Sequence, residues 1–203
     1  MKAQLVHIGD CAAVLPGFST KGALVDEPGG THQVVMAKHL TKGMPYVYDE
    51  SHRLRIHLDR DMTRYVLEPG NILFMSRGTG SYAIILEAVH QPSIAPSTFF
   101  ILQPKPHVVP AYLAWCLEQP AIQTSLIQMR TGAGTPMIPR QEFMSIRIPL
   151  PEKGLQHLIA DLWRLQCREA RLRQEISEET GRLARTLGQR IFESFGEADR
   201  EVK

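Results

Sequence analysis

The run GAGTPMIPRQEFMSIRIPLPEKGLQ, residues 132–156, separates a region of short mixed segments from a long tail that contains no proline. At its centre, residues 146–151 (IRIPLP) alternate apolar residues with polar or proline positions, a period typical of a β-strand. Pro149 and Pro151 lack a backbone N–H, so this strand must lie at a sheet edge or end there. We therefore predict that the run joins a globular module to a helical arm that opens at Leu155.

The sequence after the joint predicts a long amphipathic helix with a coiled-coil seam. Apolar or small side chains recur there mostly three or four residues apart, and Glu169 stands at the one missing step. The seam comprises Leu155, Leu158, Leu162, Leu165, Leu172, Ile176, Thr180, Leu183, Leu187 and Ile191. Gly181 and Gly188 each weaken a helix by about 1 kcal/mol, so we expect the end of the arm to be frayed.

Two interpretations of the arm are open. Forty helical residues would extend ~60 Å, which is too long for the preceding module to bury, so the seam would need a partner helix. Alternatively, the arm is a terminal helix that folds back on its own domain. We place the globular domain at residues 1–151 and the arm at residues 152–203. The predicted dimerisation residues are Leu158, Leu162, Leu165, Leu172, Ile176, Leu183 and Leu187.

Composition and charge restrict the class of protein. Of the 203 residues, 43% are hydrophobic and 22% are charged, as in soluble globular proteins. No apolar run approaches a membrane span, and the N-terminus lacks a signal-peptide core, so we expect a cytoplasmic protein. Cys11, Cys116 and Cys167 are isolated, which favours free thiols over a disulfide or metal site.

The charge is nearly balanced in both parts of the chain. Residues 1–150 contain 13 Lys and Arg against 11 Asp and Glu, and residues 151–203 contain 10 of each. Binding to nucleic acid would therefore require cations clustered on one face.

The globular module predicts an α+β fold with a β-rich sheet of mixed or antiparallel pairing. Near-helical spacing predicts a helix over residues 5–14. Apolar runs predict strands at residues 34–36, 54–58, 65–67, 72–75, 82–86 and 97–102. Helices are expected to begin at Pro110 and after Pro120, and a single turn at residues 139–143.

One loop of this module suits binding of a phosphate or a base edge. Residues 76–81, SRGTGS, follow a predicted strand and combine two glycines with Arg77. The loop matches neither a P-loop nor a full GxGxxG fingerprint, and an ordinary connection stays open. Arg53, Arg55 and His57 form one face of another predicted strand, either a solvated face or a ligand face.

Catalytic signatures are missing from the sequence. It contains no HExxH, GxSxG or DPPY-type motif and no nucleotide-binding glycine fingerprint. We therefore expect a binding protein rather than an enzyme, with no cofactor and no metal.

Taken together, these segments resemble the DNA-specificity subunit of type I restriction-modification systems. The matching residues are HIGD (7–10) with PGF (16–18), LEPGNIL (67–73) with SRGT (76–79), the strand at 94–101, VPAYL (109–113), residues 132–148, PLP (149–151), and Gln156 with Ile159-Ala160. The chain departs from the family pattern at Asn71, where Asp is usual, and at Gly154-Leu155, where an acidic pair is usual. Typical members also have two modules and two helices, so the resemblance implies a half-subunit with a single target-recognition domain.

The resemblance implies a sequence-specific reader of the DNA major groove. Two copies would pair antiparallel through their helices and present two domains to inverted half-sites. A methyltransferase subunit would bind alongside and modify adenine with S-adenosylmethionine, with a restriction subunit as an optional further partner, while this chain would hold no cofactor. The candidate DNA-binding residues are Lys38, His39, Lys42, Arg77, Thr79, Arg130, Thr135 and Arg140. The alternative is a coiled-coil scaffold or adaptor whose globular domain binds protein.

Overall fold

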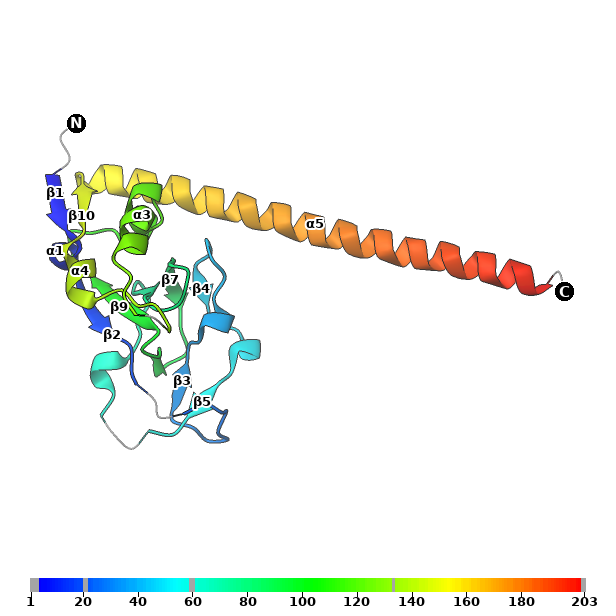
Figure 1. Ribbon diagram of the computed structural model, residues 1–203, viewed down its shortest axis with the longest axis horizontal. Coiled ribbons are helices and arrows are strands. Elements are labelled where there is room, and N and C mark those ends of the chain that lie inside the picture. Colours follow the sequence, from blue (N-terminus) through cyan, green and yellow to red (C-terminus); the bar gives the residue numbers. More distant parts are fainter. Residues whose placement is uncertain (1–3, 20–21, 59–60, 133, 202–203) are drawn as a thin grey trace. The chain divides into compact units, whose positions relative to one another are not determined.

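The computed structural model describes residues 4–19, 22–58, 61–132 and 134–201 of the chain, with side chains of the last helix up to residue 193. Contacts between Cα atoms divide the chain into two compact units, Met1–Arg164 and Leu165–Lys203. The first unit contains all the strands and the first turns of the last helix, α5 (Lys153–Glu201), which is 49 residues long (Figure 1). The fold is α+β with mixed and antiparallel sheets, as predicted.

A five-stranded sheet forms the centre of the first unit. Its order is β2-β9-β6-β7-β4, in which the first four strands pair antiparallel and β4 lies parallel to β7. The bounds are β2 (Ala12–Pro16), β9 (Phe99–Pro104), β6 (Ile72–Met75), β7 (Ala83–Ala88) and β4 (Tyr46–Val47).

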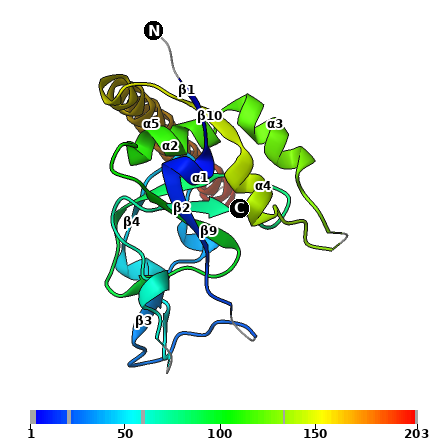
Figure 2. The ribbon, with the colours of Figure 1, turned by 90° about the vertical axis from the view of Figure 1, so that its left-hand side faces the viewer.

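Two smaller sheets complete the β-structure. In the three-stranded sheet β5-β3-β8, β3 pairs antiparallel with β5 and parallel with β8. The two-stranded sheet joins β1 to β10 (Figure 2). The bounds are β5 (Arg55–Ile56), β3 (His32–Val34), β8 (Ser93–Ile94), β1 (Gln4–His7) and β10 (Arg147–Leu150).

Helices of the first unit are short, and proline begins two of them. Proline is favoured in the first turn because the N–H it lacks would have no partner there. The α-helices are α1 (Ile8–Cys11), α2 (Pro110–Leu117), α3 (Pro120–Gln128) and α4 (Arg140–Ser145). The 3₁₀ turns are η1 (Ala37–His39), η2 (Glu50–His52) and η3 (Thr63–Tyr65).

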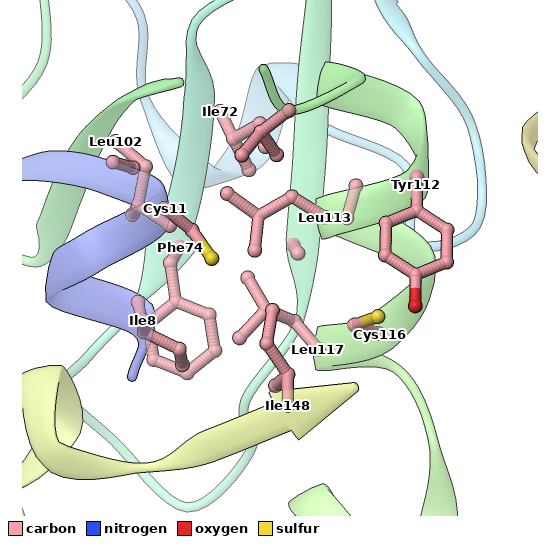
Figure 3. Close-up of a cluster of buried hydrophobic side chains, with 14 of the residues drawn as sticks. Ile8, Cys11, Ile72, Phe74, Leu102, Tyr112, Leu113, Cys116, Leu117 and Ile148 are labelled. Carbon is pink, nitrogen blue, oxygen red and sulfur yellow. The ribbon is translucent and has the colours of Figure 1, made fainter. Parts of the chain in front are cut away.

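The central sheet is buried on both faces, because alternate residues of its strands enter different clusters. On one face, Phe74 and Leu102 pack with Leu113 and Leu117 of α2, as well as with Ile8 of α1 (Figure 3). On the other face lies a second cluster, comprising Val35, Tyr46, Leu67, Leu73, Ile84, Leu86, Ala95, Phe99 and Ile101. This two-sided burial explains why the strands are apolar runs rather than alternating ones.

The strand predicted at the joint is β10, and the helix after it begins at Lys153 rather than at the predicted Leu155. Strand β10 pairs only with β1 among the described residues, so the prolines at 149 and 151 interrupt no second ladder. Beyond it, Gln156 of α5 is 1% exposed, and its Oε1 accepts a hydrogen bond of 2.9 Å from the Val109 N–H. Its Nε2 donates to the carbonyl oxygens of His107 at 3.3 Å and Pro151 at 2.9 Å. These bonds fix the start of α5 to the loop before α2.

Two local predictions were wrong. Residues 5–14 are not one helix but β1, the single turn α1 and β2, because pairing with β10 and β9 overrides their near-helical period. Residues 65–67 form no strand: Tyr65 ends η3, and Leu67 is buried as its N–H donates to the Ser93 carbonyl at 2.8 Å.

The predicted seam of α5 is open to solvent. The predicted dimerisation residues have exposed fractions from 48% at Leu172 to 66% at Ile176. The apolar residues of the seam thus form an exposed row along α5. None of the described helices has the length and apolar character that crossing a membrane requires.

Candidate nucleic-acid interface

The glycine-containing loop of residues 76–81 connects the antiparallel strands β6 and β7. Gly78 has a φ of +96°, a conformation that is accessible mainly to glycine, so the sequence here is selected by the shape of the turn. Arg77 and Thr79 flank this glycine, and both side chains are exposed. The loop therefore presents a cation and a hydroxyl from the end of a buried hairpin.

A second loop, residues 131–138, lies directly against the first. The Gly78 N–H donates to the Pro136 carbonyl at 2.9 Å, and the Ile138 N–H donates to the Ser76 carbonyl at 2.9 Å. Arg77 and Met137 form an isolated antiparallel bridge. We call these two segments the paired loops; Ala133 lies outside the described residues. The structure thus brings together Arg77, Thr79 and the exposed Thr135, which the sequence had placed in separate segments.

Arg130 supports the paired loops from the C-terminal end of α3. Its Nη2 donates to the Ser81 hydroxyl at 2.6 Å, while Nε and Nη1 are covered and have no hydrogen-bond partner in the described structure. Burial lowers the pKa of the Arg130 guanidinium from its ordinary value. With its head group enclosed, Arg130 holds a loop rather than presenting a free cation.

Lys42 lies beside the start of β7, next to the paired loops. Its Nζ is 3.8 Å from Glu118 Oε2, and the lysine side chain is 64% exposed. The Glu118 Oε1 accepts a 2.7 Å hydrogen bond from the Ala83 N–H. Burial raises the pKa of this carboxyl, opposed by the Ala83 hydrogen bond and by Lys42. Lys42 therefore keeps an exposed charge close to the loop that carries Arg77.

His39 differs from its exposed neighbour Lys38. It is 8% exposed, its Nδ1 accepts a hydrogen bond of 3.1 Å from the Met36 N–H, and its ring stacks on His52 at 5.2 Å. Burial, with the nearby His52 and Lys38, lowers the pKa of His39 to about 4, so the ring is neutral at pH 7. These contacts give His39 a structural role, and we leave it out of the proposed DNA surface.

Arg140 is also engaged within the fold. Its Nη1 donates to the carbonyl of Val14 in β2 at 3.0 Å, which ties the start of α4 to the edge of the central sheet. The candidate cations thus differ in what they contact. Lys38, Lys42 and Arg77 are exposed. Arg140 is exposed too but donates to the Val14 carbonyl, and the head group of Arg130 is enclosed beside the Ser81 hydroxyl.

Sequence reasoning missed a polar cluster behind the basic strand face. Arg55 contacts His90 through a 2.9 Å Nη2–Nε2 hydrogen bond, and Tyr48 packs on the same histidine at 5.2 Å. The Arg55 N–H donates to Asp26 Oδ1 at 2.7 Å. No spacing in the sequence joins residues from these separate loops. The face is therefore neither wholly solvated nor a plain ligand face, since Arg55 is bound inside the fold.

The described residues contain no group of three or more His, Cys, Asp or Glu side chains that could hold a metal ion. Burial raises the pKa of Cys11 to about 11 and that of Cys116 to about 12. Both thiols are therefore protonated at pH 7, and a thiol in that state is a poor nucleophile.

Several solved structures share this fold. The S subunit of a type I restriction-modification system from M. genitalium matches with a TM-score of 0.54 and 13% identity, over 79% of this chain and 38% of that chain. The HsdS subunit from Thermoanaerobacter tengcongensis matches with a TM-score of 0.60 and 16% identity, over 82% of this chain and 37% of that one.

A third match comes from a structural study of complex assembly and conformational transition of the type I R-M system. Its TM-score is 0.63 at 17% identity, over 90% of this chain and 43% of that chain. No family model matches the sequence, and no curated protein is significantly similar to it. This chain spans between 37% and 43% of the length of the three structures, and it has the α+β fold of type I restriction-modification specificity subunits.

Proposed function

We propose that this chain is a sequence-specific DNA-binding specificity subunit that directs a partner adenine methyltransferase to a bipartite site. Its globular domain, residues 1–151, reads one half-site, and its arm, residues 152–203, joins it to a second copy. A restriction subunit joins the same complex where the system also cleaves DNA. The chain itself supplies recognition and binds no cofactor.

The observation that carries this proposal is the pair of hydrogen bonds that join the paired loops, between Gly78 and Pro136 and between Ser76 and Ile138. They hold Arg77 and Thr79 of the β6–β7 hairpin next to the loop that contains Thr135, so that the three side chains can approach one base step together. An arginine can donate two hydrogen bonds to guanine, and a threonine can contact a base or a phosphate. Lys42, exposed beside the loops, suits a phosphate contact.

The test is selection of duplexes from a random pool by the chain together with a candidate adenine methyltransferase. Enrichment of one sequence supports the proposal, as does an affinity for it that falls steeply with salt, since each neutralised phosphate contributes a slope of about −0.9. Arg77→Ala is the diagnostic variant, and Arg147→Ala, which removes an exposed arginine from β10, is its matched control. If Arg77 contacts a base, Arg77→Ala should lower the binding free energy by about 1–3 kcal/mol for the selected duplex and leave binding to other duplexes unchanged.

The exposed seam of α5 favours a second candidate function, a coiled-coil scaffold whose head binds protein. This candidate predicts no enrichment of any duplex, with or without the methyltransferase, while the seam still drives self-association. Equal binding of all duplexes by the wild type would contradict both sequence-specific recognition and a purely protein-binding head.

A further inference from the structure

The paired loops form a small three-stranded ribbon with Met137 at its centre. On one side, the N–H and carbonyl of Met137 exchange two hydrogen bonds of 2.9 Å with those of Thr131. On the other side, Met137 lies opposite Arg77 in the antiparallel bridge, flanked by the two hydrogen bonds that join the paired loops. The main chain around Met137 is therefore fixed from both sides.

Burial shows which way the side chains of this ribbon point. Ser76 is 2% exposed and Ile138 is 0% exposed, whereas their chain neighbours Arg77 and Met137 are exposed. Successive residues of a strand point to opposite faces, so Ser76 and Ile138 occupy the inner face. Residues directly opposite each other in an antiparallel pair share a face, so Arg77, Met137 and Thr131 lie side by side on the outer face. We call these three residues the outer row.

The outer row has dimensions that suit the major groove of DNA. Opposite residues lie about 4.5 Å apart between Cα atoms where the pair makes no hydrogen bonds, as at Arg77 and Met137, and about 5.5 Å where it exchanges both, as at Met137 and Thr131. The row is thus about 10 Å long, against a groove about 12 Å wide that admits a β-ribbon. Since successive base pairs are about 3.4 Å apart, neighbouring members of the row can reach neighbouring base pairs.

Met137 is the apolar member of the outer row. Its side chain is 39% exposed, although the next residue, Ile138, is apolar and completely buried. The direction of the strand, rather than a lack of core nearby, therefore places Met137 outside. A long apolar side chain on a fixed backbone gains free energy when another apolar group covers it.

The neighbours of Met137 favour DNA as the covering partner. Arg77 lies directly opposite it, and Lys42, which is 64% exposed, lies beside the start of β7. Cations at these places suit guanine and phosphate. Among the groups that base pairs present in the major groove, the C5-methyl of thymine is the apolar one.

We propose that Met137 is a specificity-determining residue that packs on the C5-methyl group of a thymine, in the base pair next to the guanine that Arg77 contacts. This proposal rests on the proposed function and deepens it, because it names two neighbouring base pairs of the half-site. Thr131 has a positioning role: it holds the Met137 backbone, and its hydroxyl lies 3.5 Å from the Met137 carbonyl oxygen.

Replacement of single thymines by deoxyuridine tests this contact, because uracil differs from thymine only in lacking the C5-methyl group. The probe is the duplex that the full chain selects together with the candidate methyltransferase, with each thymine replaced in turn. For the wild type, one replacement beside a G·C pair should weaken binding about fourfold, which is ~0.8 kcal/mol for one buried methyl group at 1.4 kcal/mol per tenfold. Met137→Ala should bind the thymine duplex more weakly and should no longer distinguish it from the uracil duplex.

Three further variants complete the test. Met137→Leu keeps an apolar side chain and should retain the preference for thymine. Met137→Gln has a similar length but a polar end, and it should lose the preference. Leu5→Ala, which removes a 61% exposed apolar side chain from β1, is the matched control and should leave both affinities unchanged. Urea unfolding of each variant checks that the domain is folded.

The outcomes separate this proposal from the proposed function. A selected sequence without a thymine beside a guanine overturns the reading by Met137, and so does a wild-type preference for thymine that both Met137→Ala and Met137→Gln retain. In either case the enriched duplex still supports a DNA-specificity subunit. Failure to enrich any duplex overturns both.

Discussion

The Nη2 of Arg130 lies 2.6 Å from the Ser81 hydroxyl oxygen, so the segment that follows α3 is tied to the loop that carries Arg77 and Thr79. Under the proposed function, Arg130 would affect recognition by holding this loop, since the rest of its head group is covered. The two residues are far apart in sequence, and neither alone indicates the connection.

Loss of the Arg130–Ser81 contact is expected to weaken DNA binding without removing a DNA contact. Ser81→Ala should lower the free energy of unfolding by about 1 kcal/mol, because it leaves one more guanidinium N–H unpaired. Arg130→Ala should lower the affinity for the selected duplex. In a double-mutant cycle on stability, the two changes should be non-additive by at least about 0.5 kcal/mol. Strict additivity would show that the contact does not contribute.

The two glycines of the first paired loop should respond differently to alanine. Gly78 has a φ of +96° and open space around the position of a Cβ, so Gly78→Ala should cost about 1–2 kcal/mol through backbone strain alone. Gly80 has open space and no positive φ, which makes Gly80→Ala the matched control, expected to be neutral or slightly stabilising. Urea unfolding measures both. A similar cost for the two variants would contradict the conformation of this turn.

Gln156 is expected to be a main determinant of how α5 begins. Gln156→Leu would leave the Val109 N–H and the carbonyls of His107 and Pro151 without their partner in a buried place, at about 1–3 kcal/mol for each unsatisfied group. We expect the free energy of unfolding to fall by about 3 kcal/mol in denaturant titration. Gln166→Leu, at an exposed position of the same helix, should change it by less than about 0.5 kcal/mol.

The lowered pKa of His39 predicts that part of the free energy of unfolding is lost at acid pH. Its pKa is lowered from 6.5 to about 4 in the folded chain, so the unfolded chain binds the proton more readily between these values. The stability contributed by neutral His39 is therefore complete above pH 6.5 and is lost as the pH falls towards 4. Protonation also removes the Nδ1 acceptor used by the Met36 N–H.

The measurement is the difference in unfolding free energy between the wild type and His39→Gln from pH 7 to pH 4, at constant ionic strength. The wild-type advantage should shrink as the pH falls, because only the wild type has this histidine to protonate. A difference that is constant across the range would show that His39 is not held neutral by the fold.

Much of the architecture could be predicted from the sequence alone, because the signals are local. Pro110 and Pro120 begin α2 and α3 as expected, since proline preorganises the first turn of a helix. The prolines of residues 146–151 restrict β10 to a strand with one partner, and the regular leucines of α5 produce one long helix with an open seam. The positions of prolines and the spacing of leucines are visible within short stretches of sequence, so they can be recognised without knowledge of the tertiary structure.

The tertiary structure decided what local signals could not. Residues 5–14 have a helical period but form two strands separated by the single turn α1, because the hydrogen bonds offered by β9 and β10 outweigh a weak helical preference. The candidate interface was decided in the same way: Thr135 joins Arg77 because two distant loops exchange backbone hydrogen bonds. His39 and the head group of Arg130 are enclosed because the fold supplies partners for them, and the exposed Arg140 is held by the Val14 carbonyl. A sequence shows which side chains can bind a phosphate or a base, but burial and long-range hydrogen bonds determine which remain free to do so.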